Sequence, residues 1–287
     1  MVSDSPSMVE EQEKLAEGFD SFISQLDGQT DFHVGLLSAS FDPANPDAGQ
    51  LVAADGQSTF LTADDEFVRL FQERVRLVGL EGAGLERGLE SAQLALSPNL
   101  ATGVNEGFLR LEAELHIIFV SDGDDCIDCD RSDEAPVSQY VESFRSIKSD
   151  HSEVQVKAIV GLENNPCDRA YPATRYIAVA TKTGGSSADI CTSSWSDIMG
   201  DLGHSSTGVR ASFQTSFAAD IATLEVFVDE LKVEEHETEG WTYDPETRYI
   251  TFGADAVPDL GSEIYAVYSV LPAAGQSSTL SRLLIGG

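Results

Sequence analysis

Basic side chains are scarce in this sequence. Its 287 residues include 17 Lys and Arg against 49 Asp and Glu, so the formal net charge is −32 at pH 7. A surface of this sign repels phosphate groups, which excludes nucleic acid and anionic membranes as expected partners. The charge fits inorganic cations, saline surroundings or a cationic protein partner instead.

Long apolar runs are also missing. No stretch approaches the roughly 18 apolar residues that a membrane helix needs, and the N-terminus has no charged region followed by an apolar core. We therefore expect no membrane span and no signal peptide within this sequence, and any export signal would lie upstream of it. With 41% hydrophobic residues, the chain can still bury a sizeable core.

Motifs of catalysis are absent as well. The sequence has no GxSxG elbow, no HExxH pair and no phosphate-binding loop. Its five histidines are scattered, and His33 and His116 lie in apolar strand patterns that predict packed, hydrogen-bonded core residues. We do not expect an enzyme, and a secreted hydrolase would lack its nucleophile motif.

Cysteine is rare, with four residues. An even number fits the disulfides of an exported protein. Cys167 and Cys191 flank the last strand-to-helix segment of the N-terminal part, and we expect them to pair. Cys126 and Cys129 would then form a local bridge or stay a dithiol. Half a zinc site is the weaker alternative, because "DCIDCD" has no second closely spaced Cys or His pair.

Strand and helix patterns alternate over residues 1–205. Apolar residues at three- and four-residue spacings predict helices at 8–26, 63–79, 84–97, 136–148 and 193–203. Apolar runs bounded by turn residues predict strands at 31–41, 114–121, 153–161 and 173–185. This order predicts an α/β fold, a doubly wound and mainly parallel sheet with helices on both faces.

The pattern changes near residue 206. Short β-rich stretches such as "TLEVFVDELKV" and "SEIYAVYSVL" predict an all-β sandwich over 206–272, and 273–287 is a small-residue spacer with an apolar tail. Trp241 and Tyr243 could line a binding face, although a tryptophan entering a sandwich strand is more typical of the core.

Two loops place metal-friendly oxygens after strands. They are "SDSPS", after Met1 and Val2, and "SDGDD", after the strand at 114–121. Ligands of doubly wound sheets sit beyond the carboxyl ends of the strands, and hydroxyls and carboxylates suit Mg²⁺ or Ca²⁺. The alternative for the first loop is a helix cap, in which Ser5 or Ser7 caps the helix and Glu10 or Glu11 returns the bond.

The segments "MVSDSPSMVEEQEKL", "FHVGLLSASF", "GLERGLESAQLAL" and "LHIIFVSDGDD", in that order, resemble the von Willebrand factor type A (vWA) domain, particularly its exported bacterial versions. The resemblance covers roughly residues 1–205. "GWTYDPETRYITF" is similar to the immunoglobulin-like (Ig-like) sandwich that follows this domain in some of those proteins.

The resemblance implies a metal-ion-dependent adhesion site. Ser5 and Ser7 fall on the two serines of the family's DxSxS loop, and Asp122 falls on the aspartate that ends its fourth strand. Ser3 stands where the family has its first aspartate, and Glu81, after Leu80, stands near its threonine.

These departures predict a degenerate site that holds Mg²⁺ or Ca²⁺ weakly unless Glu81, Asp4 or Asp124 contributes. The segment "DGDDCIDCDRSDE" is either a solvated acidic loop pinned by a small disulfide or a calcium loop.

The expected function is binding. The resemblance implies an extracellular, cell-surface or periplasmic adhesion protein in which a partner's carboxylate completes the coordination of the ion. The alternative is a structural subunit of a surface filament or envelope assembly with no functional metal site. In both cases the partner is a protein, and it could be a second copy of this chain.

The first strand is short for this fold. Met1 and Val2 supply about 7 Å where a central strand usually has five or six residues. We expect either an upstream apolar strand missing from this sequence or a donor segment in its place. The tail "TLSRLLIGG" of a neighbouring subunit is the candidate donor.

Overall fold

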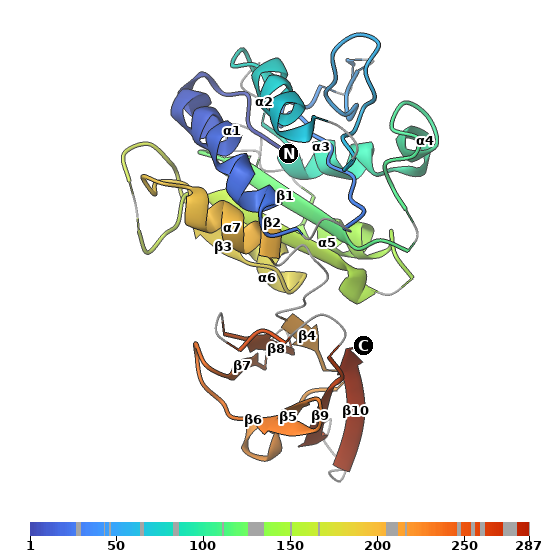
Figure 1. The fold of residues 1–287 in the computed structure, drawn as a ribbon, viewed down its shortest axis with the longest axis vertical. Helices are drawn as coiled ribbons and strands as arrows, with labels where there is room; N and C mark the ends of the chain where they lie inside the picture. The colour runs from blue at the N-terminus through green and yellow to red at the C-terminus, as the bar shows by residue number, and fades with distance from the viewer. Residues whose placement is uncertain are drawn as a thin grey trace. The chain divides into compact units, whose positions relative to one another are not determined.

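The computed structural model divides the chain into two compact units, 1–204 (unit 1) and 205–287 (unit 2) (Figure 1). It describes all residues except 27–29, 43, 46, 64–65, 83–85, 111, 126–134, 150, 166, 205–211, 216, 246–247, 254–255, 259–261, 272–279 and 287. No helix within the described residues is long and apolar enough to cross a membrane.

Unit 1 is an α/β unit built on a parallel sheet in the order β1-β2-β3. The strands are β1 Leu115–Ser121, β2 Val154–Val160 and β3 Ser187–Asp189. The helices are α1 Val9–Ile23, α2 Phe67–Val78, α3 Gly88–Ala95, α4 Pro98–Ala101, α5 Val137–Arg145, α6 Thr174–Lys182 and α7 Ser196–His204, with short 3₁₀ turns η1 Pro6–Met8 and η3 His151–Glu153. The predicted parallel sheet is confirmed.

Helices cover both faces of this sheet. Buried side chains of α3, α5 and α6 share one core with alternate residues of β1 and β2, and Phe119 stacks on Tyr176 with ring centroids 4.8 Å apart. Buried side chains of α1, α2 and α7 form a second core against Val120 and Ile159. The near-continuous apolar runs of β1 and β2 follow from this burial on both faces.

The predicted strand at 173–185 is wrong, because the chain forms α6 there. Its buried residues Tyr176, Val179 and Ala180 are spaced by three and four, which places them on one helical face. The β-branched and aromatic residues of "TRYIAVAT" suggest a strand locally, but packing of this face on the sheet decides the outcome. The third parallel strand is β3, three small or acidic residues whose sequence carries no strand pattern.

The predicted strand at 31–41 forms only isolated bridges. Val34 pairs with Leu61, and Ser38 pairs with Val2. Val2 also pairs with Val120 of β1, so it lies between β1 and Ser38, and its N–H donates to Leu37 O at 2.8 Å. Since the Ser3–Ser7 loop follows at once, the ladder on this side of β1 is short.

A disulfide joins Cys167 and Cys191, as predicted. It links the loop before α6 to the residues after β3 across a sequence separation of 24. Arg169 ties this loop to α1, because its guanidinium lies 2.6 Å from Glu10 and donates to Cys191 O at 3.1 Å. Cys126 and Cys129 lie outside the described residues.

Unit 2 contains two antiparallel sheets, in the orders β10-β9-β5-β6 and β4-β8-β7. Their bounds are β4 Ser212–Gln214, β5 Glu225–Val228, β6 Leu231–Val233, β7 Trp241–Asp244, β8 Tyr249–Phe252, β9 Ile264–Ser269 and β10 Leu280–Gly286, with a 3₁₀ turn η4 at Ile221–Thr223. Buried residues of both sheets, including Val226 and Ile250, form one core. The β-rich character predicted for this part is confirmed.

The apolar tail pairs within the chain. β10 runs antiparallel to β9, with Leu280 opposite Ser269 and Leu283 opposite Ala266. The sequence pattern places residues 273–287 outside the sandwich and makes the tail a candidate donor to a neighbouring subunit. The structure instead uses it as an edge strand of the same unit.

Trp241 and Tyr243 are core residues. They are 3% and 8% exposed, the Trp241 indole donates to Val233 O at 2.8 Å, and the Tyr243 hydroxyl accepts from Ala219 N at 3.0 Å. The core alternative therefore holds, since each ring is buried while its polar atom keeps a partner.

The β5–β6 hairpin turns on two residues with left-handed backbones. Asp229 and Glu230 have φ of 49° and 67°, as a type I′ turn requires. The Asp229 carboxylate also accepts from Glu263 N and Ser262 Oγ, both at 2.9 Å. The two positions thus share a backbone strain but differ in side-chain contacts.

Opposite effects are predicted for glycine at these two positions. Glu230→Gly should stabilise the chain by about 1 kcal/mol, because glycine adopts a positive φ freely. Asp229→Gly relieves the same strain but loses two hydrogen bonds, and should destabilise by about 1 kcal/mol net. Urea unfolding followed by far-ultraviolet circular dichroism measures both, and a Glu230→Gly variant less stable than wild type would contradict the strain argument.

Candidate functional site

The Ser3–Ser7 loop begins the candidate site. Ser5 caps η1, accepting from Ser7 N at 3.5 Å, and the two hydroxyl oxygens lie 2.7 Å apart on the surface. The cap alternative thus holds for Ser5. The same alternative expects Glu10 or Glu11 to hydrogen-bond back to the cap residue. Both glutamates instead form ion pairs with Arg169.

Glu86 joins this loop to the carboxyl end of β1. Its carboxylate accepts from Ser3 Oγ and, at 3.1 Å, from Ser121 Oγ. Ser3 Oγ in turn accepts from Ser5 N at 3.2 Å. Ser3 and Ser121 are fully buried and Glu86 is 8% exposed, so these bonds form away from bulk water.

Burial raises the pKa of Glu86 above its usual range. The two serine hydroxyls act in the opposite direction, because they stabilise the ionised form, while the nearby charges of Asp122 and Asp4 raise the pKa further. The result is a buried carboxylate surrounded by hydroxyl donors and other acids, with no basic residue among these influences in the described chain.

Asp122 follows the last residue of β1. Its backbone oxygen accepts from Tyr171 N at 2.8 Å, and the residue is 8% exposed. Within the part of the chain that the structure describes, its carboxylate has no hydrogen-bond or ion-pair partner. Its oxygens are not among the buried side-chain atoms that lack a partner, so this carboxylate reaches solvent and is open to a ligand.

Asp4 is already bound by protein groups. Ser38 and Ser40 donate their hydroxyls to its two oxygens at 2.8 and 2.9 Å. Its backbone oxygen accepts from Gly82 N, and a Cβ on Gly82 would lie 2.4 Å from Asp4 Oδ1. Glu81 lies beside this contact but is exposed, and its side chain has no hydrogen bond or ion pair among the described residues.

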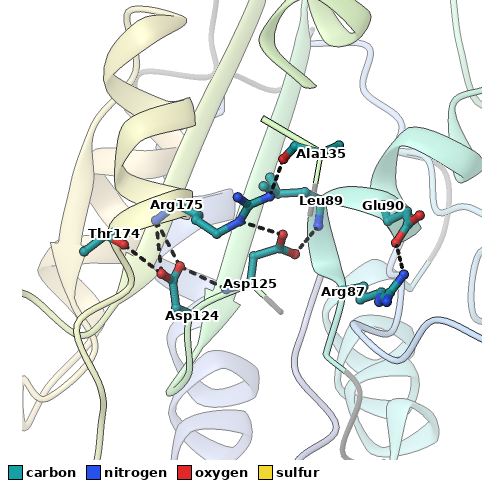
Figure 2. Close-up of polar contacts among 8 residues, drawn as sticks. All are labelled: Arg87, Leu89, Glu90, Asp124, Asp125, Ala135, Thr174 and Arg175. Atoms are coloured by element: carbon teal, nitrogen blue, oxygen red, sulfur yellow. Dashed lines mark hydrogen bonds and ion pairs between the residues drawn. The ribbon is translucent and has the colours of Figure 1, made fainter. Parts of the chain in front are cut away.

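Asp124 and Asp125 hold the starts of two helices (Figure 2). The Asp124 carboxylate accepts from Thr174 Oγ1 at 2.8 Å and from Arg175 N at 3.0 Å, in the first turn of α6. Asp125 accepts from Leu89 N at 3.0 Å, in the first turn of α3. Both acids therefore satisfy helix N-terminal donors and complement the helix dipole.

Arg175 completes this cluster. Its Nε donates to Asp125 at 3.1 Å, and its Nη2 donates to Ala135 O at 2.9 Å. Figure 2 shows the guanidinium extended between these two acceptors, while Asp124 accepts from the backbone N–H of the same arginine. Asp124 is thus committed to α6 and does not supply the site with a free carboxylate.

The two histidines of the apolar patterns have partners. His33 lies 3.1 Å from Phe108 O and stacks on Phe60, and His116 lies 3.3 Å from the Glu114 carboxylate. Both are half-buried. His116 lies in β1, as the sequence pattern predicts, whereas His33 lies outside the strands of the structure, and neither residue is fully buried.

The described residues contain no group of three or more His, Cys, Asp or Glu side chains arranged to hold a metal ion. Most of the acidic segment around the cysteine pair, residues 126–134, lies outside the described residues, so the calcium loop stays a prediction. Of the predicted ligands, the structure brings Ser3, Ser5 and Ser7 into one loop, with Asp122 near it through Glu86.

Sequence reasoning missed Glu86 and Ser121. Glu86 lies in "GAGLERGLES", where its spacing to the next acid gives no sign that it is buried. Its partner Ser3 is 83 residues away in the chain. Ser121 directly precedes Asp122 in the quoted "SDGDD" loop, and its position at the end of a buried strand was the available signal.

No protein-family model matches this sequence, and no curated protein matches it significantly.

A pH effect is predicted at Asp125. Burial raises the pKa of Asp125 to about 6, against the smaller effects of Leu89 N and Arg175. Because the folded form binds the proton more tightly, this group favours folding below about pH 4, and that contribution is lost as pH rises to about 6. Two pKa units correspond to about 3 kcal/mol.

Asp125→Asn should remove this dependence. The free energy of unfolding of the variant, relative to wild type, should increase by about 2–3 kcal/mol between pH 4 and pH 7. Burial raises the pKa of Tyr140 to about 12 and that of Tyr176 well above its usual range, so neither ring titrates in this window. Urea denaturation across pH measures the difference. A difference between Asp125→Asn and wild type that does not change with pH would refute the assignment.

Proposed function

We propose that this chain is an exported binding or adhesion protein whose partner docks at the carboxyl end of β1 through Mg²⁺ or Ca²⁺. Unit 1 serves as a vWA-like domain and unit 2 as an Ig-like sandwich. The observation that carries the proposal is Asp122, a residue at the end of β1 whose carboxylate has no partner in the described chain and lies near a loop of serine hydroxyls.

The donor set fits a hard divalent ion. Ser5 and Ser7 offer surface hydroxyls 2.7 Å apart, and Asp122 offers a carboxylate. Ser3 stands where the resemblance expects an acid, and its hydroxyl donates to the Glu86 carboxylate, so Glu86 brings an acidic group next to this position. Oxygen ligands of this kind suit Mg²⁺ or Ca²⁺, whose affinity grows with the number of carboxylates.

The fold supports the same proposal. The acids lie at the carboxyl end of a parallel sheet covered by helices on both faces, where ligands of such sheets bind. In unit 2, two antiparallel sheets enclose one core, as in an Ig-like sandwich. The Cys167–Cys191 disulfide is compatible with an oxidising compartment, such as the extracellular space or periplasm.

A role as a structural subunit is the second candidate. Phe217, Ile221 and Leu271 are about half exposed, and Leu271 N donates to Ala218 O, which sets their segments side by side. Apolar side chains gathered on a surface favour self-association. Sedimentation velocity over a wide concentration range should then show oligomers that Phe217→Ser shifts to monomer, whereas an unchanged distribution argues against this role.

The ion proposal predicts a cation-dependent thermal shift. Saturating Mg²⁺ or Ca²⁺ should raise the melting temperature of the wild type by several degrees, because an ion that binds only the folded state stabilises it. The shift should vanish in Ser5→Ala/Ser7→Ala and in Asp122→Asn. Differential scanning fluorimetry of each variant with and without the ion measures the shift. Loss of the η1 cap lowers the melting temperature in both conditions, so it does not change the difference between them.

A matched control keeps this test specific. Ser193→Ala/Ser194→Ala removes two exposed hydroxyls of unit 1 outside the site and should keep the full shift. Equal shifts in wild type and in the Ser5→Ala/Ser7→Ala variant would mean that the ion binds elsewhere, for instance through general screening of the −32 charge.

A further inference from the structure

A hollow of about 240 Å³ opens beside Asp4, on the side of the Ser3–Ser7 loop that faces Ser38 and Ser40. Its volume is several times the roughly 30 Å³ of one water molecule, so it can admit a group the size of a side chain. Its wall is formed by the apolar residues Leu37, Val52, Leu77 and Val78 and by the polar residues Asp4, Ser38, Ser40, Asn45, Asp47, Gln50 and Ser91, with Ala48 and Gly49 between them.

The hollow carries negative charge only. Asp4 and Asp47 both line it, and among its described lining residues there is no Lys, Arg or His. Asp4 is 7% exposed and lines the hollow together with apolar residues, so water screens its charge less than that of an exposed carboxylate. An anion is therefore excluded, and a cation is attracted.

The serine hydroxyl groups around Asp4 already donate their protons in hydrogen bonds. Ser38 and Ser40 donate to the Asp4 carboxylate, and Ser91 donates to Ser38 O at 2.8 Å. What these groups still offer are lone pairs on carboxylate and hydroxyl oxygens. A ligand that satisfies them must bring several hydrogen-bond donors of its own.

An apolar wall beside a cluster of acceptors matches an amphiphilic cation. The methylene stem of an alkylammonium group can pack on Leu37, Val52 and Leu77, while its three N–H donors reach the oxygens around Asp4. A bare divalent ion would use the oxygens and leave the apolar wall without a role.

We infer that this hollow is a binding site for a primary alkylammonium group, with Asp4 as its anionic anchor and Asp47 at its rim. The group belongs either to a lysine side chain of a protein partner or to a free amine. This site is separate from the proposed ion site at Ser5, Ser7 and Asp122 and does not depend on it.

The test uses n-butylammonium chloride at constant ionic strength, with binding measured by ligand-observed nuclear magnetic resonance. Wild type should bind it with a millimolar dissociation constant, and neutral 1-butanol should not bind measurably. Asp4→Asn should weaken binding at least tenfold, and the exposed control Asp55→Asn, which removes the same charge elsewhere, less than twofold.

Two further variants guard the result. Asp47→Asn should weaken binding at least threefold and decides the matter if Asp4→Asn does not fold. Ser5→Ala/Ser7→Ala should bind n-butylammonium as wild type does, so this site and the ion site fail or succeed separately. Equal weakening by Asp47→Asn and Asp55→Asn would overturn the inference, because it would show general attraction to an acidic surface.

Two more probes identify the source of the amine. Nα-acetyl-lysine methylamide binding at least as tightly as n-butylammonium indicates a lysine side chain, whereas putrescine binding at least tenfold tighter than either indicates a free diamine. Displacement of n-butylammonium by micromolar Ca²⁺ in the Ser5→Ala/Ser7→Ala variant would refute the inference and assign the hollow to a metal ion.

Discussion

Carboxylates buried at the carboxyl end of β1 need hydrogen-bond donors, and unit 1 is organised around this need. Leaving such a group without donors costs several kcal/mol. Glu86 takes its donors from Ser3 and Ser121, Asp4 takes them from Ser38 and Ser40, and Asp125 takes them from Leu89 and Arg175. Each acid thereby joins segments that are far apart in the sequence.

The exception to this pattern gives the site its character. Asp122 sits among satisfied acids but has no donor of its own in the described chain. The neighbouring carboxylates are occupied by protein groups, so they supply negative potential without competing as ligands. The two proposed sites therefore use different groups. The ion site uses the Asp122 carboxylate, and the amine-binding hollow uses the lone pairs that remain on the oxygens around Asp4.

Much of the fold could be predicted from local pattern, while its exceptions depend on tertiary packing. β1 and β2 are apolar runs buried on both faces, so periodicity and length are enough to find them. α6 is rich in β-branched residues and becomes a helix because Tyr176, Val179 and Ala180 pack on the sheet. β3 is too short and polar to carry a signal, and its strand state follows from pairing with β2.

The site was predictable in part. A loop pattern at strand ends indicates where Ser3, Ser5, Ser7 and Asp122 lie, while their role as metal ligands is implied by the resemblance to the vWA domain and stays a prediction. The bond between Ser3 and Glu86 spans 83 residues, and nothing local to either residue encodes it. Asp124 is a possible additional ligand in the sequence, but it and Asp125 accept hydrogen bonds from the first turns of α6 and α3, which lie far away in the chain.

The adjacency of Asp124 and Asp125 also limits how this region can evolve. Consecutive residues hold two different helices, α6 and α3, so the spacing between those helix starts is set by a single peptide unit. An insertion or deletion at this point would free one helix while the other stayed bound. Insertions and deletions in related sequences should therefore avoid residues 122–125. Substitutions that keep a short side chain able to accept a hydrogen bond should be tolerated there.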